Sequence, residues 1–277
     1  MKQTNTVVAA LIAALLLPPV LAPATGAAHR PPQYCASTSH PELADRLSRE
    51  LTAPARGRDT TLAFAIWDEQ TGLTCAHHPT MPYQAASIIK VSIMTGVLRR
   101  AQEENRRPTP QEEAEVRSMI VDSDDQATTT LYNSLGPAFM KRTLEVSGMD
   151  DSRLGPDDRW GRTQVTAADA MKQLDVYSNR SDVLSPEHRA DGLRLMGEVA
   201  PDQRWGTPHG APHGVTVYVK NGWAQFPDKT WQINSLGIFT ATGRRYQMAV
   251  LTDQNPTETA GIATIEQLAQ HVHHALE

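Results

Sequence analysis

Hydrophobic positions near the start of the chain recur first at helical and then at strand-like spacing. Three leucines repeat every four residues within 41–51, which predicts a helix there. An apolar run over 60–67 predicts a strand, and the polar, turn-rich stretch 68–72 separates it from a second strand at 73–77. We therefore expect an opening helix followed by a β-hairpin.

The middle of the chain changes to a helical period. Ile88, Val91, Met94 and Leu98 share one face and predict a largely buried helix over 87–103. Capping signals then define further helices. Thr109, Pro110 and Glu112 form a capping box that begins one, Gly136 and Gly148 are predicted stops, and Thr166 and Ser185 are predicted starts.

The last third returns to strands and closes with a helix. Strands are predicted over 215–220, 230–240 and 246–252, with a turn at 242–243, and a helix over 258–276. This order predicts the α+β class, with an antiparallel sheet built from both chain ends, flanked by helices, and an all-helical insertion between them. Residues 41–86 and 200–277 would form the α/β part, residues 87–199 the helical part, and a cleft between the two parts would hold the site.

The first residues resemble an export signal. Lys2 gives a positive start, residues 7–22 are almost wholly apolar, and small residues follow, so we interpret 1–28 as a cleaved signal peptide. The run is short and contains two prolines, which disfavours a stable membrane anchor. Residues 29–40 are expected to form a flexible segment leading into the domain at 41–277.

Composition and charge narrow the class of protein. Of the 277 residues, 40% are hydrophobic and 21% are charged, which is typical of a packed globular domain. The formal net charge is −5 and basic residues occur only in short pairs, so nucleic acid is not an expected partner. We expect a monomer.

The two cysteines and the histidines are further candidate site residues. In an oxidising compartment a single pair, Cys35 and Cys75, favours a disulfide over a catalytic thiol. The histidine spacing predicts no metal site, and no cofactor is expected. Trp160 is interpreted as a packing or turn residue, although it falls near the expected cleft.

Three short motifs carry candidate chemistry. Ser87 and Lys90 lie three residues apart at a predicted helix start, which would supply a nucleophile and a base, although a helix cap followed by a surface lysine has the same pattern. Ser123-Asp124-Asp125 lies between two helices, where Ser123 would relay a proton; the alternative is a simple helix N-cap.

The third motif, Lys220-Asn221-Gly222-Trp223, lies on a predicted strand. Lys220 would attract a substrate carboxylate and Gly222 would let a ligand backbone approach, while the alternative is an ordinary strand end. Each motif is weak alone. All three occur together, in order and in the expected structural contexts.

The combination resembles the penicillin-recognising β-lactamase and transpeptidase family, in particular its class A β-lactamase branch, whose motifs are Ser-x-x-Lys, Ser-Asp-Asn and Lys-Thr-Gly. The resemblance covers roughly the chain beyond the signal segment. It implies that Ser87 is the nucleophile, Lys90 its base and Ser123 the proton relay. It also implies an oxyanion hole from the backbone N–H groups of Ser87 and Trp223.

The sequence departs from that family at three places. Asp125 stands where the family usually has Asn, and Asn221 where it has Thr or Ser. Class A enzymes carry a deacylating Glu in the loop before the helix at Thr166, whereas residues 153–163 contain none. Asp157 or Asp158 would have to substitute, so we expect Ser87 to acylate readily and the acyl-enzyme to hydrolyse slowly.

These observations predict a secreted serine hydrolase acting on a β-lactam or on a peptide with a terminal carboxylate. Two alternatives remain open. One is a D-Ala-D-Ala carboxypeptidase or acyltransferase, and the other is a non-catalytic module that keeps the cleft but has lost turnover.

Overall fold

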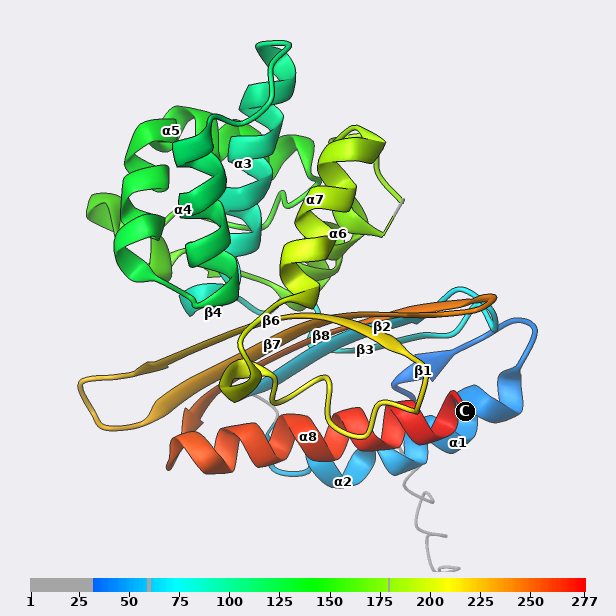
Figure 1. Ribbon diagram of the computed structural model, residues 1–277. Helices are drawn as coiled ribbons and strands as arrows, with labels where there is room; N and C mark the ends of the chain where they lie inside the picture. Colours follow the sequence, from blue (N-terminus) through cyan, green and yellow to red (C-terminus); the bar gives the residue numbers. More distant parts are fainter. Residues whose placement is uncertain (1–31, 59–60, 179) are drawn as a thin grey trace, which may run out of the picture. The chain divides into compact units, whose positions relative to one another are not determined.

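The computed structural model describes residues 32–58, 61–178 and 180–277, so the predicted signal segment 1–28 lies outside the described residues. A six-stranded sheet lies at the centre of this part of the chain (Figure 1). From one edge to the other the strands are β1 (Cys35–Ala36), β3 (Thr74–His77), β2 (Leu62–Asp68), β8 (Arg244–Asn255), β7 (Trp231–Ala241) and β6 (Thr216–Gln225). All neighbours are antiparallel. The prediction of an antiparallel sheet drawn from both chain ends is confirmed.

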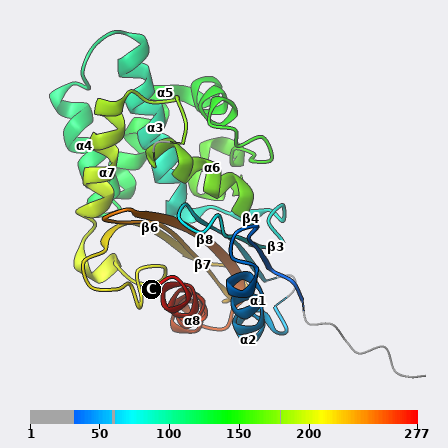
Figure 2. The same cartoon turned by 90° about the vertical axis from the view of Figure 1, so that its right-hand side faces the viewer.

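One face of the sheet is covered by helices from the two ends of the domain (Figures 1 and 2). They are α1 (Pro41–Glu50), the short α2 (Thr52–Ala55) and α8 (Glu258–Ala275). Leu47 of α1, Leu268 of α8 and Phe64 of the sheet are fully buried in one hydrophobic cluster. Burial of this apolar surface holds the terminal helices in place.

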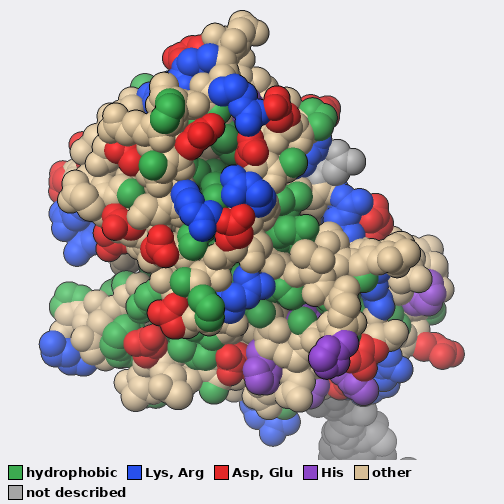
Figure 3. Space-filling model, in the orientation of Figure 1, with side chains coloured by type: hydrophobic (Ala, Val, Ile, Leu, Met, Phe, Trp, Pro, Cys, Tyr) green, Lys and Arg blue, Asp and Glu red, His purple; other side chains and the backbone are tan. Residues whose placement is uncertain are grey.

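The other face carries the helices of the middle of the chain (Figure 1). They are α3 (Lys90–Glu103), α4 (Pro110–Val121), α5 (Asp125–Val146), α6 (Ala167–Tyr177) and α7 (Pro186–Gly197). Ion pairs between Arg107 and Glu187 and between Arg117 and Glu198 join the α4 region to α7. On the face drawn in Figure 3, Lys and Arg side chains accordingly lie among Asp and Glu over these helices.

Local sequence signals for these helices agree with the structure. Thr109 and Glu112 form the predicted capping box of α4, and the Thr166 hydroxyl caps α6 at the Asp169 nitrogen. Gly136 has a φ of 73° and interrupts α5, as its predicted role as a helix stop requires. The predicted turn at 242–243 joins β7 to β8.

The predicted single helix over 87–103 is wrong at its start. Residues Ala86–Ile89 form a 3₁₀ turn, η1, and the α-helix begins only at Lys90. The strand predicted at 215–220 is also longer and continues to Gln225. A two-stranded sheet, β4 (Tyr83–Gln84) with β5 (Gln164–Val165), lies outside the main sheet and holds the chain that enters η1.

The predicted disulfide is confirmed. Cys35 of β1 and Cys75 of β3 are bonded, and their Cα atoms are 3.9 Å apart at directly paired positions. The segment 29–40, expected to be flexible, therefore contains a strand anchored to the sheet. None of the described helices has the length and apolar character needed to cross a membrane.

Candidate active site

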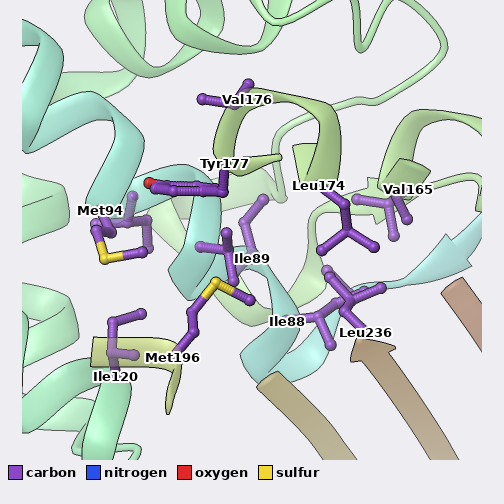
Figure 4. Packing of buried hydrophobic residues seen from close by; sticks show 14 of the residues in the cluster. Ile88, Ile89, Met94, Ile120, Val165, Leu174, Val176, Tyr177, Met196 and Leu236 are labelled. Carbon is purple, nitrogen blue, oxygen red and sulfur yellow. The ribbon is translucent and has the colours of Figure 1, made fainter. Parts of the chain in front are cut away.

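Ser87 lies on η1, which is fixed from both sides by buried neighbours. Ile88 and Ile89 are fully buried and point into the core beside Leu174 and Leu236 (Figure 4). Asn234 Nδ2 donates to the Ala85 carbonyl at 3.1 Å and Gln173 Nε2 donates to the Ile88 carbonyl at 3.2 Å. These contacts hold the backbone on either side of the partly exposed Ser87.

Lys90 is the first residue of α3, and its side chain is fully buried. Its Nζ donates to the Ser123 carbonyl at 2.7 Å, to Ser123 Oγ at 3.0 Å and to Asp125 Oδ1 at 2.6 Å. These three acceptors occupy the three N–H bonds of the ammonium. Among the described residues, Ser87 is not a hydrogen-bond partner of Lys90.

The environment of Lys90 makes its proton easier to lose than that of a lysine in water. Burial lowers the pKa of Lys90, and the hydrogen bond and charge of Asp125 oppose this shift only in part. The Trp160 ring also lies near the amine, with its centroid 5.1 Å from Nζ. The ring favours the charged form as a cation–π partner.

Ser123 lies between two lysines. Lys220 of β6 is fully buried, and its Nζ donates to Ser123 Oγ at 3.0 Å, the same distance as Lys90. Burial, followed by the charge of Lys90, lowers the pKa of Lys220 to about 7. Ser123 itself has a φ of 56°, a left-handed conformation that costs a non-glycine residue about 1–3 kcal/mol.

The rest of the β6 motif is placed differently from expectation. Asn221 is fully buried, and its Nδ2 donates to the carbonyls of Gln203 and Trp205 at 2.8 Å, so its amide is turned to the chain before β6. A Cβ at Gly222 would lie 2.8 Å from the Ser87 nitrogen. The chain that approaches Gly222 closely is thus η1 of the same protein.

A cavity of about 620 Å³ opens beside η1. It is lined by Gln84, Ala86, Ser87, Asp125, Arg159, Trp160, Gly161, Arg162, Trp223, Ala224, Gln225, Phe226 and Pro227. Ser87, Asp125 and Trp223 therefore face one space, whereas Lys90, Ser123 and Lys220 are not among its lining residues. Within the lining, Asp125 is the one carboxylate.

The two carboxylates suggested for deacylation do not line this cavity. Asp157 and Asp158 lie on the 3₁₀ turn η2 (Pro156–Asp158), and both are exposed. Asp157 Oδ2 pairs with Arg159 Nη2 at 2.9 Å. Neither residue is brought to Ser87.

Trp160 is the site residue that sequence reasoning missed. It begins the 3₁₀ turn η3 (Trp160–Arg162), and its indole nitrogen donates to Thr129 Oγ1 at 3.2 Å. Its only sequence signal was its place in the loop before the helix at Thr166. In the part of the chain that the structure describes, no group of three or more His, Cys, Asp or Glu side chains is arranged as metal ligands.

The α+β fold, a sheet with helices on both faces and with these side chains gathered beside one sheet edge, is that of a β-lactamase-related serine hydrolase. The model of the beta-lactamase enzyme family, Beta-lactamase2, matches residues 113–276, which is more than half of the chain. The chain belongs to this family.

Relatives and solved structures agree with that assignment. The chain is 26% identical over 245 residues to "Putative lipoprotein LppW" of Mycobacterium tuberculosis and of Mycobacterium bovis, covering 86% of this chain and 77% of the relative. A β-lactamase from Burkholderia vietnamiensis has a TM-score of 0.70 at 20% identity, over 82% of this chain and 95% of that one. A mutant of PBP-A, in an acyl-enzyme complex with penicillin G, has a TM-score of 0.71 at 19% identity, over 84% and 96%. The structural likeness shows the shared fold.

Proposed function

We propose that the protein is an exported serine acyl-transfer enzyme that forms an acyl-enzyme on Ser87 with β-lactams or with peptides ending in a carboxylate. One observation carries the proposal. Lys90 and Lys220 each lie 3.0 Å from Ser123 Oγ, and Lys90 also pairs with Asp125, which lines the same cavity as Ser87. This network of three stretches distant in sequence supports the proposal that they act together on a substrate bound at Ser87.

In the proposed acylation step, neutral Lys90 accepts the Ser87 hydroxyl proton as Ser87 Oγ attacks the substrate carbonyl. The new C–O bond forms, the carbonyl oxygen becomes an oxyanion, and the C–N bond then breaks. The proton passes from Lys90 through the Ser123 hydroxyl to the leaving nitrogen. Because Ser123 Oγ accepts from both lysines, its own hydrogen is available for this transfer.

The oxyanion would be stabilised by the backbone N–H groups of Ser87 and Trp223. Two features support this assignment. Gly222 brings β6 against the Ser87 nitrogen, and β6 is an edge strand, so one set of its backbone groups has no partner within the sheet. Lys220 would act on a substrate carboxylate through its charge and through Ser123, since it does not line the cavity itself.

Slow hydrolysis of the acyl-enzyme is part of the proposal. Residues 153–163 contain no Glu, and Asp157 and Asp158 lie outside the cavity lining. Asp125 is already paired with Lys90. A water molecule near the ester therefore lacks a dedicated carboxylate base.

The absence of a free carboxylate base among the described residues of the cavity lining favours a second candidate function, transfer of the acyl group to an amine. An amine nucleophile depends less than water on a general base. A peptidyl-D-alanyl-D-alanine offered with and without amine acceptors separates the two: hydrolysis alone supports a carboxypeptidase, and a new amide supports a transferase. The name of the relatives, putative lipoprotein, supports action outside the cytoplasm.

The test is the time course of intact protein mass after mixing with a penicillin. We expect rapid gain of the penicillin mass and persistence of the adduct for many minutes. Lys90→Ala should acylate much more slowly because its base is missing. Ligand binding without any covalent adduct would instead support a non-catalytic binding module.

A further inference from the structure

Asp125 is the one carboxylate among the residues that line the cavity. It is the first residue of α5, its side chain is 75% exposed, and it lines the cavity together with Ser87. One carboxylate oxygen, Oδ1, accepts from Lys90 Nζ at 2.6 Å. The other oxygen accepts no hydrogen bond from the described residues.

A carboxylate at this position offers only acceptors to a ligand. An amide side chain would instead offer N–H donors to a substrate carbonyl. A substrate carbonyl oxygen placed beside Asp125 Oδ2 would meet a like partial charge, whereas a nitrogen carrying hydrogens would gain a charge-assisted hydrogen bond. At this position the cavity therefore favours a hydrogen-bond donor on the substrate, whereas an amide side chain would also donate to a substrate carbonyl.

The pairing with Lys90 extends this argument. When Lys90 gives up its proton to act as the base, Asp125 loses the charge that compensates it. A cationic group on the substrate would restore an ion pair at that step. It would also place a second positive charge near Lys90, which favours the neutral amine.

The other charged groups of the lining do not serve this purpose. Arg159 is paired with Asp157, and Arg162 carries a positive charge. Both would repel a substrate cation, so Asp125 is the one charged group of the lining that would attract it.

We propose that Asp125 is a specificity-determining residue that selects acyl donors carrying a primary amine near the reacting carbonyl. This inference rests on the proposed acylation of Ser87. It names the substrate class of that reaction: aminoacyl or amine-bearing peptidyl donors, and β-lactams with an amino side chain.

The test compares two β-lactams that differ by one amino group. Ampicillin and benzylpenicillin share their nucleus, carboxylate and phenyl group, and in slightly acidic buffer the ampicillin amine is protonated. The second-order rate constant for acylation is measured for each by intact-protein mass spectrometry. We expect the wild type to prefer ampicillin by about tenfold, the size of one hydrogen bond to a charged group.

In Asp125→Asn the ratio of the ampicillin rate constant to the benzylpenicillin rate constant should fall to about one, because the uncharged amide gives the ampicillin amine no ion pair. The ratio of the two rates is the readout, since any change in the reactivity of Lys90 affects both substrates alike. Asp124→Asn is the matched control. Asp124 caps α5 at the Ala127 nitrogen and does not line the cavity, so its substitution should leave the preference intact. Asp125→Ser, which also removes the charge, should repeat the loss.

The outcomes separate the inference from the proposed function. Acylation by both compounds at equal rates, or a preference that survives in Asp125→Asn and Asp125→Ser, would overturn the role of Asp125 while leaving the acyl-enzyme intact. Absence of any adduct with either compound would overturn the proposed function and this inference with it.

Discussion

Lys90 and Lys220 share one hydrogen-bond partner, the Ser123 hydroxyl, whose oxygen lies 3.0 Å from each amine nitrogen. Both lysines are fully buried. Asp125 compensates the charge of Lys90 directly, whereas among the described residues Lys220 has only Ser123 and the Asn221 carbonyl as hydrogen-bond partners. The two amines therefore differ in environment, and protonation of one affects the other.

The first prediction concerns the pH dependence of acylation. Burial and the charge of Lys90 lower the pKa of Lys220 to about 7, so Lys220 loses its proton as the pH rises through that value. If its charge helps to hold a substrate carboxylate, the second-order rate constant for acylation by a penicillin falls above pH 7. Measured across the pH range, Lys220→Arg should shift this fall to higher pH, because a guanidinium stays protonated. An unchanged alkaline limb in Lys220→Arg would exclude Lys220 as its source.

The second prediction concerns the contact between Gly222 and η1. A Cβ at Gly222 would lie 2.8 Å from the Ser87 nitrogen and 2.7 Å from the Ile88 nitrogen, both backbone atoms. Gly222→Ala must therefore displace Ser87, and we expect acylation to slow by about 100-fold, as for loss of one oxyanion donor. Gly197→Ala is the control, because its Cβ meets only the Tyr218 ring at 3.4 Å. Equal acylation by the two variants would contradict the proposed oxyanion hole.

The third prediction concerns the lifetime of the acyl-enzyme. The Trp160 ring lines the cavity and lies near Lys90, and we expect it to exclude water from the space beside the ester. Trp160→Ala should shorten the acyl-enzyme lifetime, and Trp160→Phe, which keeps a ring, should have an intermediate effect. The decay of the adduct mass after removal of free penicillin measures both. A longer lifetime in Trp160→Ala would mean that the indole assists hydrolysis.

Much of this site follows from the sequence because its motifs have clear local contexts. The loop at Ser123 lies between two helices with strong capping signals, and Lys220 lies on a regular strand. The 3₁₀ turn at Ala86–Ile89 could not be predicted from the sequence, because the spacing of hydrophobic residues does not distinguish it from the first turn of an α-helix. Here Gln173 and Asn234, distant in sequence, hold its backbone.

Trp160 and Asn221 show what local patterns leave open. The position of the Trp160 ring depends on the conformation of the loop 154–162, in which Gly155 packs closely against Arg159. Gly155 allows this close packing, since a Cβ there would lie 2.1 Å from the Arg159 carbonyl oxygen. Asn221 turns its amide to carbonyls contributed by Gln203 and Trp205, which no strand pattern indicates.

The fourth prediction concerns acid stability and a residue outside the site. His273 of α8 is fully buried, with Nδ1 2.8 Å from the Tyr246 hydroxyl and Nε2 2.8 Å from the Thr207 carbonyl. Burial lowers its pKa to about 4, against a usual value of 6.5, while the bond to Thr207 opposes the shift. The unfolded chain therefore binds more protons than the folded protein between these two values.

The contribution of His273 to the free energy of unfolding is therefore fully present above pH 6.5. It is lost as the pH falls towards 4, which lowers the free energy of unfolding by roughly 3 kcal/mol. Urea unfolding at several pH values measures the slope. In His273→Gln, which lacks the titrating group, the free energy of unfolding should depend less on pH over this interval. An equally steep decrease in the variant would assign the effect to other groups.

The most direct measurement for the account is peptide mapping of the protein after brief exposure to a penicillin. We predict one covalent adduct, located on the Ser87 hydroxyl, and its complete absence in Ser87→Ala. An adduct on any other residue, or no adduct in the parent protein, would contradict the central claim that Ser87 is the nucleophile.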